Sequence, residues 1–529
     1  MIEIRRRSLL TGAAGAALAP LLAMPAIGQN SRQSTLRFVP QANLTALDPI
    51  WTTATVTGNH GFYVFDTLYA ANARGEPRPQ MAQGHEVSAD GKTWRITLRP
   101  GLTYHDGEAV RAADCVESLK RWAARDPFGQ LLAAVTDAWR AADDRTVEIR
   151  LKRPFPLLLA ALAKTDSAPV VMPERLARTD PFKAITEMVG SGPYRFVASE
   201  FVAGSRAVYE RFDGYAPRPE APDHATGGKV AHFPRIEWVV MPDPATAASA
   251  LVKGEVDWWE RPLADLQPLL AKSPDIRREV IDKAGRTALM RLNCLHAPFD
   301  DPKLRAAVRA TVMQENYMQA SQGDDRSTWT TSLSLWPRNT PYHAEEKDLM
   351  PGDIARAKAM LKDAGYSGRK TVIINPTDFP DIGPLGQVTA DALGQAGMNV
   401  DLAESDWGTV IQRRSSREPV ERGGWSIFHT TGPAVLYGNP ATSPLVRGQG
   451  EAGWFGWWKS DRAEALTRDW LDAPDEAGQR KAAAELGRLV LEEAPTLPLG
   501  QFTIRTAFRN SITGILDGTS PYPWNVRRV

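Results

Sequence analysis

The stretch from residue 234 to residue 260 constrains the fold of this chain more than any other. Ile236, Trp238 and Val240 alternate with the residues between them, which predicts a strand. The sequence PDP at 242–244 ends that strand, an Ala-rich helix follows, and residues 256–259 form a second strand. Because so short a helical connection joins parallel strands through a right-handed crossover, the stretch predicts an α/β lobe.

Length and composition limit the remaining choices. The chain has 529 residues, of which 43% are hydrophobic, so we expect two or three domains rather than one core. The formal net charge of +1 gives no basic footprint for nucleic acid. No uncharged apolar run of about 18 residues follows residue 30, so we expect no membrane-spanning helix in the mature protein.

The first 28 residues are typical of an export signal. The sequence RRRSLL at 5–10 precedes a segment rich in Gly, Ala and Leu, and AIG at 26–28 offers small residues for cleavage. The arginine pair favours the twin-arginine route, with an ordinary secretory leader as the alternative. No cysteine lies near the cleavage point, so we expect a free periplasmic protein without a lipid anchor.

Cys115 and Cys294 are the only two cysteines. They could pair in an oxidising compartment. However, they lie in segments that we assign to different domains, and neither belongs to a C-x-x-C motif. We therefore predict two buried free thiols.

Five sequence segments of the mature chain match the pattern of a known family, in the same order along the chain. They are FDTLY at 65–69, VSADGKTWRITLRPGLTYHDGEAVRAADCVESLKR at 87–121, GSGPYRF at 190–196, LMRLNCLHAPFDDPKLRAAVRA at 289–310 and AKAMLKDAGY at 357–366. With these phrases the chain resembles the extracellular solute-binding proteins of family 5, the receptors of peptide- and nickel-type ABC importers. The resemblance implies an α/β, periplasmic-binding-protein-like two-lobe fold of type II, cluster C, with an additional α+β domain inserted in lobe I.

The chain can be divided on this basis. We expect lobe I to comprise residues 29–58, 188–284 and 498–529, the inserted domain residues 59–187, and lobe II residues 285–497. Within the inserted domain, Asp90-Gly91 predicts a hairpin turn, and Glu117 and Arg121 are spaced for an i,i+4 pair on a helix. Strand and helix patterns alternate in lobe II, which predicts a mostly parallel sheet.

Two lobes joined by two crossings predict a binding cleft between them. Ligands of open α/β sheets bind at strand ends, and a ligand that contacts both lobes favours the closed form. The resemblance implies that a membrane permease recognises that form. We therefore predict a monomeric periplasmic substrate-binding protein of an ABC importer, which binds a small organic solute and pairs with ABC permease subunits. A di- or oligopeptide receptor is the alternative, and a periplasmic chaperone, sensor or metal-dependent hydrolase is the alternative from another class.

The sequence lacks the common motifs for catalysis. HExxH, GxSxG, GxxxxGK[ST] and C-x2-C do not occur, and the eight histidines include no pair spaced i,i+3 or i,i+4. We therefore predict that the protein is not an enzyme and that it has no cofactor, catalytic residue or metal ligand. Two alternatives remain. The first is a metal site whose ligands come together only in the folded protein, and the second is a nickel chelate or haem as the transported ligand.

One difference from the family's sequence pattern bears on the class of ligand. Peptide-binding members hold the ligand α-amine with an acidic residue shortly after a Gly-Trp pair that matches Gly424-Trp425. Here no Asp or Glu lies between Glu421 and Glu451. Because a buried ammonium without a carboxylate is costly, we favour a polar, neutral or anionic organic solute over a peptide.

The same region supplies candidate contacts. Its imidazole and hydroxyl groups can donate and accept hydrogen bonds, and its aromatic rings can form flat walls. Three further residues occupy places that the family uses near its ligand. The predicted ligand-binding residues are Trp425, His429, Thr430, Thr431 and Tyr437, together with Asn43, Leu44 and Trp407.

Overall fold

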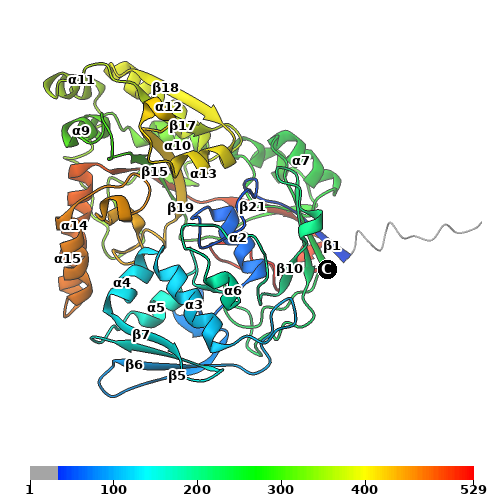
Figure 1. Cartoon of the computed structure of the whole chain (residues 1–529). Coiled ribbons are helices and arrows are strands. Elements are labelled where there is room, and N and C mark those ends of the chain that lie inside the picture. The colour runs from blue at the N-terminus through cyan, green and yellow to red at the C-terminus, as the bar shows by residue number, and fades with distance from the viewer. Residues whose placement is uncertain (1–33) are drawn as a thin grey trace, which may run out of the picture.

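The computed structural model describes residues 34–529, so the export signal predicted for residues 1–28 lies outside the described residues. Two large β-sheets and one smaller sheet organise this part of the chain (Figure 1). No helix in residues 34–529 combines the length and the apolar character needed to cross a bilayer.

The first large sheet contains the predicted strand-helix-strand unit. Strands β12 (Arg235–Val239) and β13 (Trp258–Trp259) both pair in parallel with β1 (Thr35–Val39), which lies between them, so the predicted parallel arrangement is confirmed. The connecting helix α7 (Pro244–Lys253) is capped at its N-terminus by Asp243, which accepts a 2.7 Å hydrogen bond from the Thr246 amide. We call this sheet, with the elements packed on it, the first lobe. Its strand order is β10 (Tyr194–Phe196), β11 (Arg206–Arg211), β12, β1, β13, β21 (Arg505–Arg509) and β14 (Ile276–Val280).

The second large sheet, with its helices, is called the second lobe. Its strand order is β16 (Trp329–Thr330), β20 (Thr496–Phe502), β15 (Arg286–Leu292), β19 (Ile427–Pro433), β17 (Thr371–Pro376) and β18 (Val400–Ser405). The prediction of a mostly parallel sheet is wrong. Strand β17 runs parallel to β18 and β19, but β15 is antiparallel to β19 and β20. The reason is that β15 carries the chain away from the first lobe whereas β20 carries it back.

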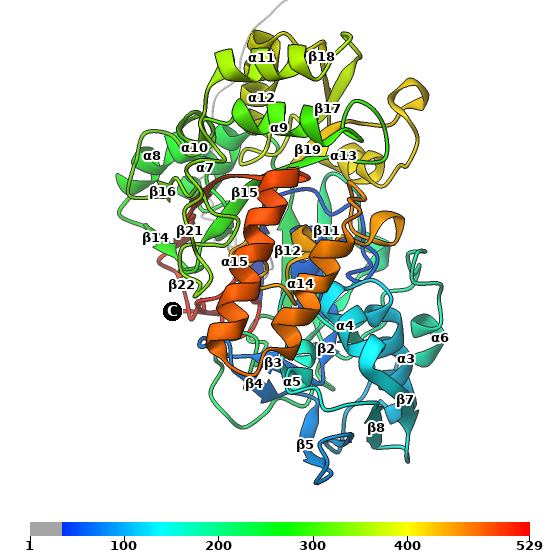
Figure 2. The same cartoon turned by 90° about the vertical axis from the view of Figure 1, so that its left-hand side faces the viewer.

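Helices flank the second sheet. They are α9 (Pro302–Ala310), α10 (Gln314–Gln322), α11 (Ile354–Asp363), α12 (Gly383–Ala396), α13 (Trp407–Arg414), α14 (Asp461–Asp472) and α15 (Glu476–Glu493). Figure 2 shows α14 and α15 side by side, in agreement with their many close backbone approaches. Asp301 caps α9 and Asp353 caps α11, each by accepting a hydrogen bond from a backbone amide.

A four-stranded antiparallel sheet lies between β1 and β10 in the sequence. It comprises β5 (Ala82–Val87), β6 (Thr93–Leu98), β8 (Thr146–Leu151) and β7 (Thr136–Ala141), and α3 (Ala112–Ala123) and α4 (Pro127–Val135) accompany it. The hairpin at Asp90-Gly91 is confirmed, because it joins β5 to β6 and Gly91 has a φ of 69°. The predicted Glu117–Arg121 pair is wrong: Glu117 bonds Lys120, and Arg121 pairs with Asp48.

Shorter elements complete the described chain. They are α2 (Thr55–Val64), α5 (Leu158–Leu162), α6 (Glu174–Ala177), α8 (Gln267–Ala271), β2 (Asp66–Thr67), β9 (Val170–Val171), β3 (Tyr69–Ala71), β4 (Pro77–Pro79), β22 (Ile512–Thr513) and β23 (Arg527–Arg528).

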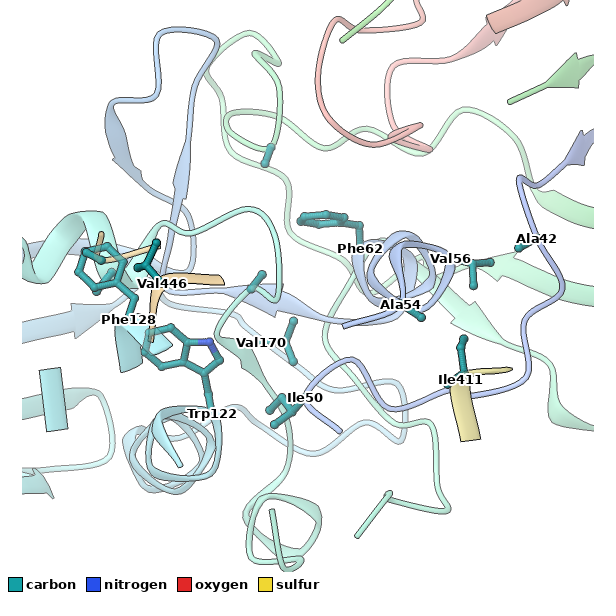
Figure 3. Packing of buried hydrophobic residues seen from close by; sticks show 14 of the residues in the cluster. Ala42, Ile50, Ala54, Val56, Phe62, Trp122, Phe128, Val170, Ile411 and Val446 are labelled. Atoms are coloured by element: carbon teal, nitrogen blue, oxygen red, sulfur yellow. The ribbon is translucent and has the colours of Figure 1, made fainter. Parts of the chain in front are cut away.

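The chain crosses between the two large sheets twice. The first crossing lies between β14 and β15, and the second lies between Phe502 and Arg505, a few residues after the expected limit at 497. The domain limits themselves remain a prediction. Figure 3 shows part of one continuous buried cluster that includes Trp122 and Phe128 of α3 and α4 and Val446 of the second lobe.

Both cysteines are free thiols, as predicted. Cys115 is buried in α3, as predicted, whereas Cys294, which follows the end of β15, is only half-buried.

Candidate ligand-binding cavity

A cavity of about 460 Å³ lies between the two lobes and the four-stranded sheet's helices. Its walls come from three separate parts of the sequence: residues 49–55 in the first lobe; residues 122–130, 164–167 and Phe182 beside the four-stranded sheet; and residues between 411 and 457 in the second lobe. This volume falls in the range of sites that enclose a small organic molecule.

The first-lobe wall is fixed by a buried ion pair. Asp48 accepts hydrogen bonds of 2.7 and 3.2 Å from the Arg121 guanidinium of α3. The same carboxylate accepts the backbone amides of Ile50 at 2.9 Å and Ile185 at 3.0 Å. Because both charged side chains are almost completely buried, their full set of hydrogen bonds holds the 49–55 loop in one position.

The wall beside the four-stranded sheet begins at the start of α4. Asp126 accepts hydrogen bonds from the amides of Phe128 at 2.9 Å and Gly129 at 3.1 Å, which caps the helix. The other oxygen of Asp126 forms an ion pair with Lys164. This pair links α4 to the segment 164–167, so that both line the cavity as one unit.

The second-lobe wall is the end of β19 with the turn that follows it. Thr430, Thr431 and Gly432 line the cavity together with Tyr437. A Cβ atom on Gly432 would lie 2.3 Å from the Tyr437 hydroxyl oxygen, so only glycine lets this ring fold back over the strand. Thr431 is 7% exposed, and its hydroxyl has no hydrogen-bond partner among residues 34–529.

The charged residues of the lining are mostly paired. Arg447 binds Glu464 through two hydrogen bonds of 3.0 and 2.9 Å. Arg125 differs, because no carboxylate of the described chain lies within 4.0 Å of it; it donates to the Trp51 carbonyl at 3.0 Å and its guanidinium carbon lies 4.7 Å from the Phe182 ring centroid. Burial lowers the pKa of Arg125. The lining carboxylates are Asp126, Asp166 and Glu451, and its cations are Arg125, Lys164, Arg417 and Arg447.

Two buried arginines of the second lobe reach the 49–55 loop from behind the lining. The Arg414 guanidinium donates to the Thr53 hydroxyl at 3.3 Å. The Arg286 guanidinium lies 3.5 Å from the Thr55 hydroxyl and 3.4 Å from the Thr431 carbonyl oxygen. Burial lowers the pKa of each of these arginines to about 10. Both stay charged at neutral pH and bring positive potential to this side of the cavity.

Three of the eight predicted ligand contacts line the cavity, namely Thr430, Thr431 and Tyr437. Trp425 and His429 lie in the core of the second lobe instead. Trp425 is 1% exposed and its indole N–H donates to the Arg414 carbonyl at 3.1 Å. His429 makes a 2.7 Å hydrogen bond with the Thr389 hydroxyl, and burial lowers its pKa to about 3, so the ring is neutral.

The other three predicted residues also lie outside the lining. Asn43 accepts a 2.9 Å hydrogen bond from the Gly204 amide, and Leu44 is 2% exposed. Trp407 packs edge-on against Phe379, with 4.9 Å between the ring centroids. The loop after β1 does reach the cavity, but with residues 49–55 rather than 43–44.

Sequence reasoning missed the lining residues beside the four-stranded sheet. Arg125, Asp126 and Asp166 lie in short connections between helices and strands, with no motif around them. The sequence carries one signal for these residues. Asp126-Pro127 is typical of a helix start, which places the Asp126 carboxylate at the N-terminal end of that helix.

Two open sheets joined by two crossings, with a polar and aromatic cavity between them, define the class of two-lobed solute-binding proteins. Residues 76–443 match the family described as bacterial extracellular solute-binding proteins, family 5 middle. The chain belongs to this family. It is 36% identical, over the full length of both chains, to a probable peptide ABC transporter periplasmic-binding protein, y4tO, of Sinorhizobium fredii. It is 24% identical to the glutathione-binding protein GsiB of Salmonella typhi, over 89% of this chain and 90% of that one.

Solved structures share the fold. The binding protein AgaA of A. tumefaciens R10, in complex with agropinic acid, has a TM-score of 0.77 and 19% identity, with 94% of this chain and 99% of that one covered. The periplasmic binding protein DppA of Helicobacter pylori, in complex with the peptide STSA, has a TM-score of 0.76 and 18% identity, with 95% and 99% covered. At these identities the likeness concerns the fold alone.

Proposed function

We propose that this protein is the periplasmic substrate-binding protein of an ABC importer. It captures a small organic solute or a short peptide in the cavity and delivers it, chemically unchanged, to a membrane permease. The observation that carries the proposal is that one cavity is lined by both lobes of a two-crossing fold. The names of its relatives, a peptide transporter's binding protein and a glutathione-binding protein, support the same role.

The cavity walls explain how binding would close the protein. A solute that touches Trp51 of the first lobe and Tyr437 of the second contributes free energy only when the lobes are together. Such differential contact is what shifts a hinged protein towards its closed form. The aromatic side chains of the lining offer apolar surface to the solute, and the charged side chains orient its polar groups.

The cavity offers a carboxylate to the amine of a peptide ligand. The segment between Glu421 and Glu451 lacks Asp and Glu, but the cavity receives Asp126 and Asp166 from beside the four-stranded sheet. The charges of the lining are therefore compatible with a peptide as well as with a non-peptide solute.

Native mass spectrometry and thermal unfolding test the proposal. We expect the purified protein to carry, or to bind at one site, a small molecule. Binding should add RT ln(1 + [L]/Kd) to the free energy of unfolding and so raise the melting temperature. Tyr437→Ala should weaken that binding, because it removes a cavity wall. The matched control is Tyr342→Ala, since Tyr342 packs between Trp336 and Trp470 of the second lobe, outside the lining. Turnover of the bound molecule, or equal loss of affinity in both variants, would contradict the proposal.

A further inference from the structure

One carboxylate of the lining has no side-chain partner. Asp126 caps α4 and pairs with Lys164. Glu451 is exposed at the rim, with a carboxylate oxygen 3.6 Å from Arg417. Within residues 34–529, Asp166 has no ion pair within 4.0 Å and no hydrogen bond from another side chain, although it is only partly accessible to solvent.

The backbone around Asp166 is held firmly. The indole N–H of Trp122 in α3 donates a 2.9 Å hydrogen bond to the carbonyl of Ser167. Ser167 has a φ of 48°, in the left-handed region that residues with a Cβ rarely adopt. Because Trp122, Asp166 and Ser167 all line the cavity, this contact holds the backbone that carries Asp166 at the cavity wall.

The cations near Asp166 are engaged elsewhere. Lys164 pairs with Asp126, and Arg286 donates towards Thr55 and Thr431 from behind the lining. Burial raises the pKa of Asp166 even though the charges of Lys164 and Arg286 act in the opposite direction. The protein groups around Asp166 therefore do not fully compensate this negative charge.

The second-lobe wall offers uncharged oxygen atoms. Thr431 as a whole residue is 7% exposed, and its buried hydroxyl oxygen has no hydrogen-bond partner in the described part of the chain. Tyr437 lies close enough to Asp166 for the carboxylate charge to raise the pKa of its hydroxyl, second only to the effect of burial. A carboxylate and two hydroxyl oxygens thus border one cavity, and together they match the donors of a cationic nitrogen.

We propose that Asp166 is a specificity-determining residue that binds a cationic nitrogen of the solute, an ammonium or a guanidinium. The inference rests on the proposed function, because it assigns the ligand class of the same cavity. No group of three His, Cys, Asp or Glu side chains in residues 34–529 is placed to hold a metal ion, which favours an organic cation. Since Asp166 comes from beside the four-stranded sheet and Tyr437 from the second lobe, a cation that contacts both also joins these two parts of the molecule.

Matched probe pairs test this assignment on the full mature protein. The protein is unfolded and refolded to remove any co-purified solute, which is identified by mass spectrometry. Binding is then measured by calorimetry with alanyl-phenylalanine and its N-acetyl form, arginine and citrulline, and choline and 3,3-dimethylbutanol. We expect the member of at least one pair that carries the additional ammonium or guanidinium group to bind more tightly than the partner that lacks this group. Asp166→Asn should weaken that binding roughly ten- to hundredfold.

The control is Asp137→Asn, which neutralises an exposed carboxylate on β7 and should leave affinity unchanged. Asp166→Asn should also melt no lower than the wild type without ligand, because the carboxylate it removes has no side-chain partner and the asparagine oxygen can still accept the Ser167 amide. A bound solute without a cationic nitrogen, or unchanged affinity in Asp166→Asn, would overturn the inference while leaving the proposed function intact. A protein that carries no solute and binds no probe would overturn both.

Discussion

Arg261 of the first lobe and Asp381 of the second lobe form an ion pair across the interface, with 3.1 Å between the guanidinium Nη1 and the carboxylate Oδ2. Their side chains are only 8% and 13% exposed. Arg261 follows β13, and Asp381 precedes α12. Because each partner belongs to a different lobe, the pair exists only while the lobes are together.

Loss of this pair should weaken the closed form. In Asp381→Asn, Arg261 keeps only the more distant carboxylate of Glu260, at 3.7 Å. We expect ligand affinity to fall by about 1–3 kcal/mol, because a charge-assisted hydrogen bond formed on closure is lost. Calorimetry measures the affinity, and small-angle X-ray scattering measures the radius of gyration with and without ligand.

The matched control for Asp381→Asn is Glu485→Gln. Glu485 pairs with Arg462 at 2.9 Å, but both residues lie in the second lobe and are well exposed. This control should change neither affinity nor closure, since surface pairs within one rigid unit contribute little. Equal effects of the two substitutions would show that the Arg261–Asp381 pair has no special role in closure.

Trp425 should act on stability rather than on binding. Its ring packs against Phe428 and Trp457, with centroid separations of 5.1 and 5.7 Å. Trp425→Ala would leave a large cavity in the second-lobe core, so we expect the free energy of unfolding to fall by about 3–5 kcal/mol. Chemical denaturation measures this loss. If affinity drops by more than the lower stability explains, Trp425 contacts the ligand after all, as the sequence suggested.

The elements whose pattern is local were predicted best. The α7 unit has a strand alternation, an Asp243-Pro244 start and a Gly254 stop, and each signal acts within a few residues. The capped starts of α9 and α11 are of the same kind. Strand direction in the second sheet was not predictable in this way, because β15 and β20 are about 200 residues apart and pair only in the fold.

The residues that line the cavity were likewise predicted where the sequence signal is local and missed where it is not. Thr430, Thr431 and Tyr437 were found because they lie in one segment at a strand end. Their neighbour His429 was predicted with them, yet it bonds Thr389 in the core. The backbone beside Asp166 is held at the cavity by the hydrogen bond from Trp122 to the Ser167 carbonyl, a contact between distant residues for which a single sequence carries no signal.

The two thiols should respond differently to a thiol reagent. Burial raises the pKa of both, and Cys115 is completely enclosed in α3, whereas Cys294 is partly accessible. Because the thiolate is the reactive form, we expect Cys115 to be inert in the native protein at pH 8 and Cys294 to react slowly. Ellman's reagent counts the reactive thiols. In guanidinium chloride both should react without prior reduction; a need for reductant would reveal a disulfide.

The carboxylate of Asp282, at the first crossing, predicts a pH dependence of stability. Burial raises its pKa to about 6, despite the opposing charge of Arg286 and the 3.2 Å hydrogen bond from the Gly285 amide. In the unfolded chain the pKa is about 3.9, so the folded state binds the proton more tightly. The charged form therefore destabilises the fold: there is no penalty below pH about 4, the penalty grows as the pH rises to about 6, and it is complete above that.

Asp282→Asn removes the charge and keeps an oxygen that can accept the Gly285 amide. At pH 7 we expect the variant to be more stable than the wild type by about 1–3 kcal/mol, and at pH 4 to be equally stable. Urea unfolding at both pH values measures the difference. Asp137→Asn, which alters an exposed carboxylate, should show no such change between the two pH values. A stability difference for Asp282→Asn that is the same at pH 4 and pH 7 would mean that this carboxylate titrates alike in the folded and unfolded chains.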